Sequence, residues 1–130
     1  MMANQETQFF ACAQCGTVIE EISGNQDEYT CSGRPLKKLT PNTSEGAQEK
    51  HLPVVEQDGK NITVKVGSVF HPMTEEHSIE WVSLQTRKGS QRVRLNPNAE
   101  PVAQFVLADG DEAVAAYAYC NLHGFWKTQI

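Results

Sequence analysis

Two groups of potential metal-binding side chains lie near the two ends of this 130-residue chain. Near the start, Cys12 and Cys15 form a C-x-x-C pair, and Cys31 follows later in the same segment. Near the end, Cys120 and His123 stand close together in the stretch CNLHG. Thiolates and imidazoles are ligands for zinc, iron and copper, so both groups are candidates for binding a metal.

The chain contains four histidines, and each lies in or beside a stretch that we expect to be irregular. A single histidine is more often a surface residue or a hydrogen-bonded core residue than a ligand. Four histidines beside expected strands weaken that interpretation, because loops on a rigid sheet often carry function. Together with one thiol they form a candidate ligand set: His51, His71, His77, Cys120 and His123.

The chemistry of this set favours redox-active iron over structural zinc. A structural zinc site uses four ligands, commonly with more sulfur than this set supplies. One thiolate, several imidazoles and an exchangeable position suit iron, although copper or zinc can bind the same ligands. Spacing alone does not show that the five side chains converge, so the residues by themselves leave the shared site open.

Composition excludes several classes of protein. A net charge of −5 argues against a nucleic-acid partner, since such binding depends on lysine and arginine neutralising phosphates. No apolar run approaches the roughly 20 residues of a membrane span, and the N-terminal stretch does not resemble a signal peptide. We therefore expect a cytoplasmic protein without a membrane partner, whose reduced cysteines serve metal binding or redox chemistry.

The chain changes character along its length. Residues 1–39 are rich in cysteine and glycine and cannot build a sufficient core alone, so a metal would stabilise them. Residues 40–50 are polar, with Pro41 and Gly46, and predict a linker or long loop. The remainder, within a second domain of residues 40–130, alternates short β-rich runs with turn signals.

This alternation predicts an all-β, antiparallel sandwich or barrel. The run 113–118 is rich in alanine and could be helical on propensity, but its two tyrosines and the preceding turn favour a strand. The expected strands are 52–56, 62–70, 79–86, 91–95, 102–108 and 113–120.

Several segments resemble those of a known family. The stretches EKH (49–51), HPMTEEHSIEW (71–81) and YCNLHGFWK (119–127) resemble the signature segments of superoxide reductases. The N-terminal stretches FFACAQCG and YTCSG resemble the desulforedoxin-like module of desulfoferrodoxins, the members with two metal centres. The resemblance implies an immunoglobulin-like β-sandwich preceded by a small desulforedoxin-like metal-binding module.

The resemblance also implies a function, the one-electron reduction of superoxide to hydrogen peroxide at a mononuclear non-haem iron. The four histidines would be its equatorial ligands and Cys120 its axial thiolate. Glu49 would close the sixth position of ferric iron, and Lys50 would offer a positive charge to superoxide. We expect backbone amides within 121–124 to hydrogen-bond the Cys120 sulfur and tune the potential. The implied electron donor is rubredoxin or a similar small protein, and the implied assembly is a homodimer.

The N-terminal module departs from the family pattern. Members with an intact first centre carry two adjacent cysteines where this chain has Cys31 and Ser32. Cys12, Cys15 and Cys31 therefore form a possible second metal site, with Ser32 a doubtful fourth ligand and iron, zinc or no metal as the occupant. Two other functions stay open: a non-catalytic iron electron carrier or metal-binding protein, and a binding module with incidental histidines.

Other residues near these segments are expected to be structural. Trp81 and Trp126 are interpreted as core or site-wall aromatics, and Met73 as a packing residue. Residues 119–127 should be ordered and packed, although they lie close to the chain end, because the proposed iron depends on them.

Overall fold

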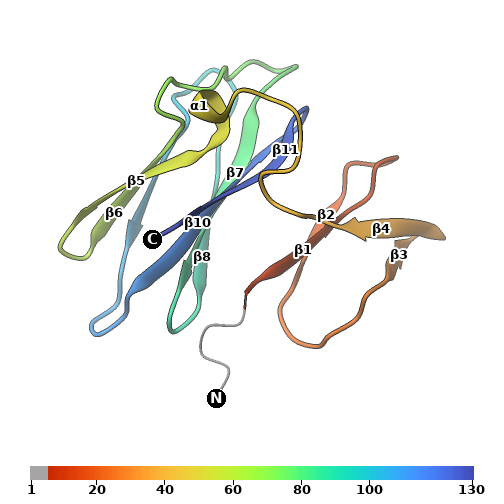
Figure 1. The fold of residues 1–130 in the computed structure, drawn as a ribbon, viewed down its shortest axis with the longest axis horizontal. Helices are drawn as coiled ribbons and strands as arrows, with labels where there is room; N and C mark the ends of the chain where they lie inside the picture. Colours follow the sequence, from red (N-terminus) through yellow and green to blue (C-terminus); the bar gives the residue numbers. More distant parts are fainter. Residues whose placement is uncertain (1–5) are drawn as a thin grey trace. The chain divides into compact units, whose positions relative to one another are not determined.

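The computed structural model of the chain describes residues 6–130. The chain divides into two compact units, Met1–Thr40 and Pro41–Ile130, and the boundary falls where the polar segment 40–50 begins (Figure 1). Strands dominate both units, so the all-β prediction is confirmed. The one helix among the described residues is a single turn, α1 (Gln48–His51). No helix in residues 6–130 is long and apolar enough to cross a membrane.

The first unit is one small antiparallel sheet with strand order β2-β1-β4-β3. Its strands are β1 (Gln8–Ala11), β2 (Val18–Glu21), β3 (Tyr29–Cys31) and β4 (Arg34–Lys38). Ser32 and Gly33 form the tight turn between β3 and β4, with positive φ at both residues (50° and 78°), as a two-residue hairpin turn requires. The core of this unit is small and consists of Phe10, Cys12 and Leu36, with Ile19, Tyr29 and Cys31 packed against it.

The second unit contains two antiparallel sheets, with strand orders β11-β10-β7-β8 and β5-β6-β9 (Figure 1). The strands are β5 (Pro53–Asp58), β6 (Asn61–Val66), β7 (Ile79–Thr86), β8 (Ser90–Arg94), β9 (Val102–Val106), β10 (Ala113–Cys120) and β11 (Gly124–Gln129). All six predicted strands are present, and the alanine-rich run belongs to β10. Strand β11 was not predicted as a strand, and β6 ends four residues before its predicted limit.

The core of the second unit lies between its two sheets. Strand β6 alternates, with Ile62, Val64 and Val66 fully buried, as expected for a strand with one face on a core. Residues from β7, β9 and β10 complete the same cluster, so both sheets contribute to one hydrophobic layer. This arrangement agrees with the expected immunoglobulin-like sandwich.

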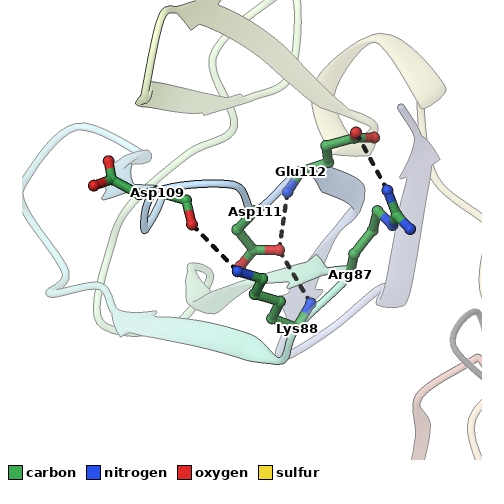
Figure 2. A network of polar contacts seen from close by, with 5 residues as sticks. All are labelled: Arg87, Lys88, Asp109, Asp111 and Glu112. Carbon is green, nitrogen blue, oxygen red and sulfur yellow. Dashed lines mark hydrogen bonds and ion pairs between the residues drawn. The ribbon is translucent and has the colours of Figure 1, made fainter.

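The loops at the two ends of this sandwich carry different kinds of residues. At the end where β7 stops and β10 starts, the turns are joined by polar contacts (Figure 2). The Asp111 carboxylate accepts hydrogen bonds from the backbone amides of Lys88 and Glu112, at 3.0 and 2.9 Å. A hydrogen bond from Thr86, aided by these amides, lowers the pKa of Asp111. These contacts stabilise turns, whereas the candidate ligands lie where β7 begins and β10 ends.

Candidate metal centre

Five predicted ligands converge at that other end of the sandwich. Each offers one ligand atom, and the five atoms all lie within 4.8 Å of one another. They come from four places in the chain: His51 from the end of α1, His71 and His77 from the loop before β7, Cys120 from the end of β10, and His123 from the turn before β11. The sequence predicted which residues could bind a metal, and the fold brings all five together.

The four imidazole rings are arranged in a circle, in which each ring contacts two others. Ring centroids are 4.6 Å apart for His51–His71 and His71–His77, and 4.9 and 5.0 Å apart for His51–His123 and His77–His123. Neighbouring rings are nearly perpendicular, with interplanar angles from 76° to 83°. Four rings in this arrangement surround one central position edge by edge.

Hydrogen bonds fix which ring nitrogens face that position. His51 Nδ1 lies 2.7 Å from the Ala47 carbonyl oxygen, and His71 Nδ1 lies 2.6 Å from the Pro72 carbonyl oxygen. A carbonyl oxygen only accepts, so each Nδ1 carries the hydrogen and each neutral ring has its lone pair on Nε2. These two Nε2 atoms are 3.2 Å apart. Two facing lone pairs repel each other, whereas a cation between them satisfies both.

Ring nitrogens of His77 and His123 also indicate a site for a cation between the four rings. His77 Nε2 is buried and has no hydrogen-bond partner within the described residues. His123 Nδ1 lies 3.0 Å from His51 Nε2. With metal–nitrogen bonds of about 2.1 Å, neighbouring nitrogens of a square would be roughly 3.0 Å apart. The imidazole spacing therefore fits a bound metal ion.

Burial favours the neutral form, which a metal needs, in three of the imidazoles. It lowers the pKa of His51 and His77, and it lowers the pKa of His71 to about 4. The positive charge of Lys50 contributes to the lower pKa of both His51 and His77. Lys50 is exposed, but its charge still acts on the ligand cluster.

Cys120 is completely buried, and burial raises the pKa of its thiol. Backbone amides oppose this effect: the N–H of His123 donates to Sγ at 3.3 Å, and the amide of Leu122 also lowers the pKa. Both donors lie within residues 121–124, so the prediction of backbone hydrogen bonds to this sulfur is confirmed. A bound cation would complete the stabilisation of the thiolate.

Two side chains hold the ligand-bearing loops in place. The Trp126 ring stacks on His51 at 4.8 Å and 24°, and its indole N–H donates to the His123 carbonyl at 3.0 Å. Trp126 is therefore the site-wall aromatic expected from the sequence. Asn121 accepts from the Ser78 amide at 3.0 Å and donates to the Glu76 carbonyl at 2.9 Å, which joins the turn after β10 to the loop before β7.

The sequence did not assign Gly46 any role beyond the linker, but it lies against the ligand rings. A Cβ at this position would be 3.0 Å from His51 Cε1 and 3.3 Å from His123 Cγ. Its φ of 147° is also a conformation that side-chain-bearing residues rarely adopt. Gly46 therefore lies directly against two of the imidazoles, and the only signal for this contact in the sequence is a glycine within a polar stretch.

Glu49 and Lys50 lie in α1, directly before His51, and both side chains are exposed. The turn after β6 holds this helix through its backbone. The Glu49 carbonyl accepts from the Val69 amide at 3.0 Å and from the Ser68 hydroxyl at 3.2 Å. A Cβ at Gly67 would be only 2.4 Å from the same carbonyl oxygen, so this close approach requires glycine. The catalytic roles of the two side chains stay predictions.

The N-terminal cysteines have a more open environment. Cys12 is buried, Cys31 is half-buried and Cys15 is exposed, and all three thiols are free. The sulfurs of Cys15 and Cys31 are 3.9 Å apart. A hydrogen bond with the Thr17 hydroxyl, with a further contribution from Cys12, lowers the pKa of Cys15 to about 6. Ser32 is exposed in the β3–β4 turn, and a second metal at this site stays a prediction.

A family model for desulfoferrodoxin matches residues 43–129, a range that contains all five converging ligands. The chain belongs to the desulfoferrodoxin family. The resemblance seen in the sequence is thus confirmed, and it covers more than the C-terminal unit. A desulfoferrodoxin of Nitratidesulfovibrio vulgaris is 40% identical over 98% of this chain and 99% of its own. A desulfoferrodoxin homolog of Archaeoglobus fulgidus is 39% identical over 93% of this chain and 95% of its own.

Solved structures of similar proteins agree with this membership. The superoxide reductase of Treponema pallidum is 39% identical, with a TM-score of 0.82 over 96% of this chain and 100% of that chain. The superoxide reductase of Giardia intestinalis is 34% identical, with a TM-score of 0.55 over 63% of this chain and 97% of that one. This desulfoferrodoxin fold therefore occurs in relatives of different length, and the shorter match leaves more than a third of this chain uncovered.

Proposed function

We propose that this desulfoferrodoxin is a superoxide reductase, an enzyme that reduces superoxide to hydrogen peroxide at a mononuclear non-haem iron. The observation that carries the proposal is the convergence of four imidazoles and one buried thiol, whose ligand atoms all lie within 4.8 Å of one another. The similar structures from Treponema pallidum and Giardia intestinalis are both named superoxide reductases. The ligand set and these relatives favour the same chemistry.

Bound iron would supply the single electron of this reaction, and two protons complete the conversion of superoxide to hydrogen peroxide. We assign His51, His71, His77, Cys120 and His123 as its ligands. The carbonyl partners of His51 and His71 orient those rings and hold their protons on Nδ1. The amide of His123 stabilises negative charge on the Cys120 sulfur, and such donors tune the redox potential of a metal site.

Lys50 addresses an electrostatic problem. The chain carries a net charge of −5, which repels an anionic substrate. A local cation beside a reactive site can reverse the field where the substrate arrives and raise its rate of capture. We propose that Lys50 does this, because its charge already acts on His51 and His77. We assign Glu49, its neighbour in α1, as the carboxylate ligand of the ferric state.

The finer parts of the proposal rest on the family resemblance. We propose that residues 40–130 form the catalytic domain and that residues 1–39 form an accessory module with a possible metal site. Rubredoxin or a similar small protein would return the electron to iron after each turnover. We further propose that the protein is cytoplasmic and works as a homodimer.

A superoxide pulse tests the proposed reaction. The protein is loaded with ferrous iron under anaerobic conditions and mixed with a known quantity of superoxide. A reductase produces one hydrogen peroxide for each superoxide consumed, and no dioxygen. Dioxygen in the amount expected for dismutation, or no consumption of superoxide beyond a metal-free control, would contradict the proposal.

A further inference from the structure

The three N-terminal cysteines differ in exposure, and two of them lie together near the surface. Cys12 is 2% exposed and belongs to the small core with Phe10 and Leu36. Cys15 is exposed, Cys31 is half-buried, and their sulfur atoms are 3.9 Å apart. Both thiols are free. The first unit thus presents a pair of neighbouring, accessible thiols beside a third that is packed in its core.

The residue types around this pair do not complete a four-sulfur metal site. The position after Cys31 is Ser32, whose neutral hydroxyl is a poor substitute for a thiolate ligand. A closed tetrahedral site needs four ligands, and the sequence of this unit contains only three cysteines. Two thiols that are close together and not enclosed by a complete ligand set are available for other chemistry.

We propose that Cys15 and Cys31 form a redox-active dithiol that hydrogen peroxide converts into a disulfide. This site goes beyond the proposed function, although hydrogen peroxide is the product that the proposed function releases. Because the peroxide diffuses and can also be added directly, the two proposals can be tested separately.

The chemistry balances in two steps. The Cys15 sulfur attacks one oxygen of hydrogen peroxide, the O–O bond breaks, and the departing hydroxide takes the thiol proton and leaves as water. The Cys31 sulfur then attacks the sulfur of the resulting sulfenic acid, forming the S–S bond and releasing the second oxygen as water. Two thiols lose two electrons and two protons, and one peroxide becomes two waters.

The local structure allows the second step. A disulfide bond is about 2.05 Å long, so the two sulfurs must approach by roughly 1.9 Å. Cys15 lies in a turn, and Cys31 is the last residue of β3, directly before the Ser32–Gly33 turn. Neither cysteine lies within the interior of a strand, so its side chain can move without disrupting a ladder of backbone hydrogen bonds.

Thr17 supports the first step. Its hydroxyl oxygen lies 3.2 Å from the Cys15 sulfur, within the range for a hydrogen bond to sulfur. A hydroxyl at this distance can donate to the Cys15 thiolate and hold it in place. Cys12, whose sulfur lies 3.5 Å from Gln14 Oε1 and is buried, has no comparable access to solvent.

The test uses the full-length protein, fully reduced and then mixed anaerobically with one equivalent of hydrogen peroxide. Free thiols are alkylated, and the peptides are identified by mass spectrometry. We expect two of the four thiols to be lost, one peptide pair to be joined through Cys15 and Cys31, and dithiothreitol to restore both thiols. Full alkylation of both cysteines after peroxide, or a cross-link that involves Cys12 or Cys120 instead, would overturn the proposal.

Two further measurements complete the test. In Cys31→Ser the second step cannot occur, so Cys15 should accumulate as a sulfenic acid that dimedone labels; an unlabelled Cys15 in this folded variant contradicts the proposed order. Metal analysis of the untreated protein is the second measurement. Zinc or iron beyond the one equivalent expected at the Cys120 cluster, together with protection of Cys15 and Cys31 from peroxide, would also overturn the proposal. A protein that forms the cross-link but does not reduce superoxide would refute the proposed function alone.

Discussion

The two cysteine-containing regions of this molecule show how differently a fold can treat the same side chain. Cys120 is completely buried, and its sulfur receives a hydrogen bond from the His123 amide. Cys15 lies at the surface in a turn, and its pKa is lowered to about 6 mainly by the Thr17 hydroxyl. The Cys120 sulfur is positioned to bind a metal, whereas the Cys15 sulfur is accessible to reagents from solution.

The size of the surrounding core explains the difference. The second unit buries residues of two sheets in one layer, which fixes the ends of β7 and β10 and therefore the loops that follow them. The first unit has one sheet and a small buried cluster of Phe10, Cys12 and Leu36. A small core can fix one cysteine by packing but leaves the others in turns near the surface.

The largest expected effect is that of Cys120→Ser, which would remove the proposed thiolate ligand. Loss of a hydrogen-bonding partner of a metal ligand costs about 10–100-fold in affinity or activity, so loss of the ligand itself should cost at least about 100-fold in superoxide reduction. The visible absorption of thiolate-bound iron should also disappear. Cys12→Ser is the matched control, since it changes the buried cysteine of the other unit and should retain that absorption. The reverse result would place the iron in the first unit.

A smaller effect is expected from Gly46→Ala, which adds a methyl group against the rings of His51 and His123. The added Cβ lies 3.0 Å from His51 Cε1, so the ring must shift and the nitrogens must leave their present spacing. We expect about a 10-fold loss of iron affinity, measured by competition with a chelator.

Gly89→Ala provides the control for this substitution. A Cβ at Gly89 meets no atom within 4 Å, so the same change of residue there should leave iron affinity unaltered. Equal affinities of the two variants would show that the contact between Gly46 and the rings does not position them.

Lys50→Ala should slow the reaction by a few-fold at low ionic strength, through weaker attraction of the superoxide anion. The rate of the variant should also depend less on salt, because screening then has one less attraction to weaken. Rapid mixing with superoxide across a range of salt concentrations measures both effects. Lys60→Ala is a suitable control, since Lys60 is exposed in the β5–β6 turn and pairs with Asp109. Identical salt dependences for the two variants would remove Lys50 from substrate capture.

The smallest effect concerns the first unit and pH. The Tyr29 hydroxyl donates to Glu21 and lowers the pKa of that carboxylate. A carboxylate with a lowered pKa in the folded state stabilises the fold above its unfolded pKa of about 4.3, and this contribution is lost as the pH falls through the folded value. Tyr29→Phe should therefore reduce the protection of β1–β4 amides from hydrogen exchange at pH 7 and have little effect near pH 3.

Glu28→Gln is the control for this prediction, since Glu28 is an exposed carboxylate of the same unit. It should leave the exchange of β1–β4 amides nearly unchanged at both pH values. An equal loss of protection in Tyr29→Phe at pH 7 and pH 3 would show that the contact acts through packing and not through the charge of Glu21.

Residue types and periodicity were sufficient to predict much of the second unit. Short β-rich runs separated by turn signals predicted the strands. Four histidines beside those strands and one thiol gave the candidate ligand set, while its convergence at one metal was implied by the resemblance to superoxide reductases. Strand β11 was missed because its sequence, GFWKTQ, has no clean alternation and its two buried aromatics are adjacent.

Contacts between distant loops could not be predicted in the same way. Gly46 lies against the rings of His51 and His123, and His123 is 77 residues further along the chain. Asn121 likewise connects its turn to the backbone of Glu76 and Ser78, and nothing in the sequence CNLHG specifies those partners. Such contacts depend on the positions of whole strands, which one sequence does not determine.

X-ray absorption at the iron edge tests most directly which of the two regions holds the iron. The reduced, full-length protein with one equivalent of iron should show one sulfur and four nitrogen ligands, as the cluster of His51, His71, His77, Cys120 and His123 requires. A signal dominated by three or more sulfur ligands, or one without any sulfur, would contradict that assignment.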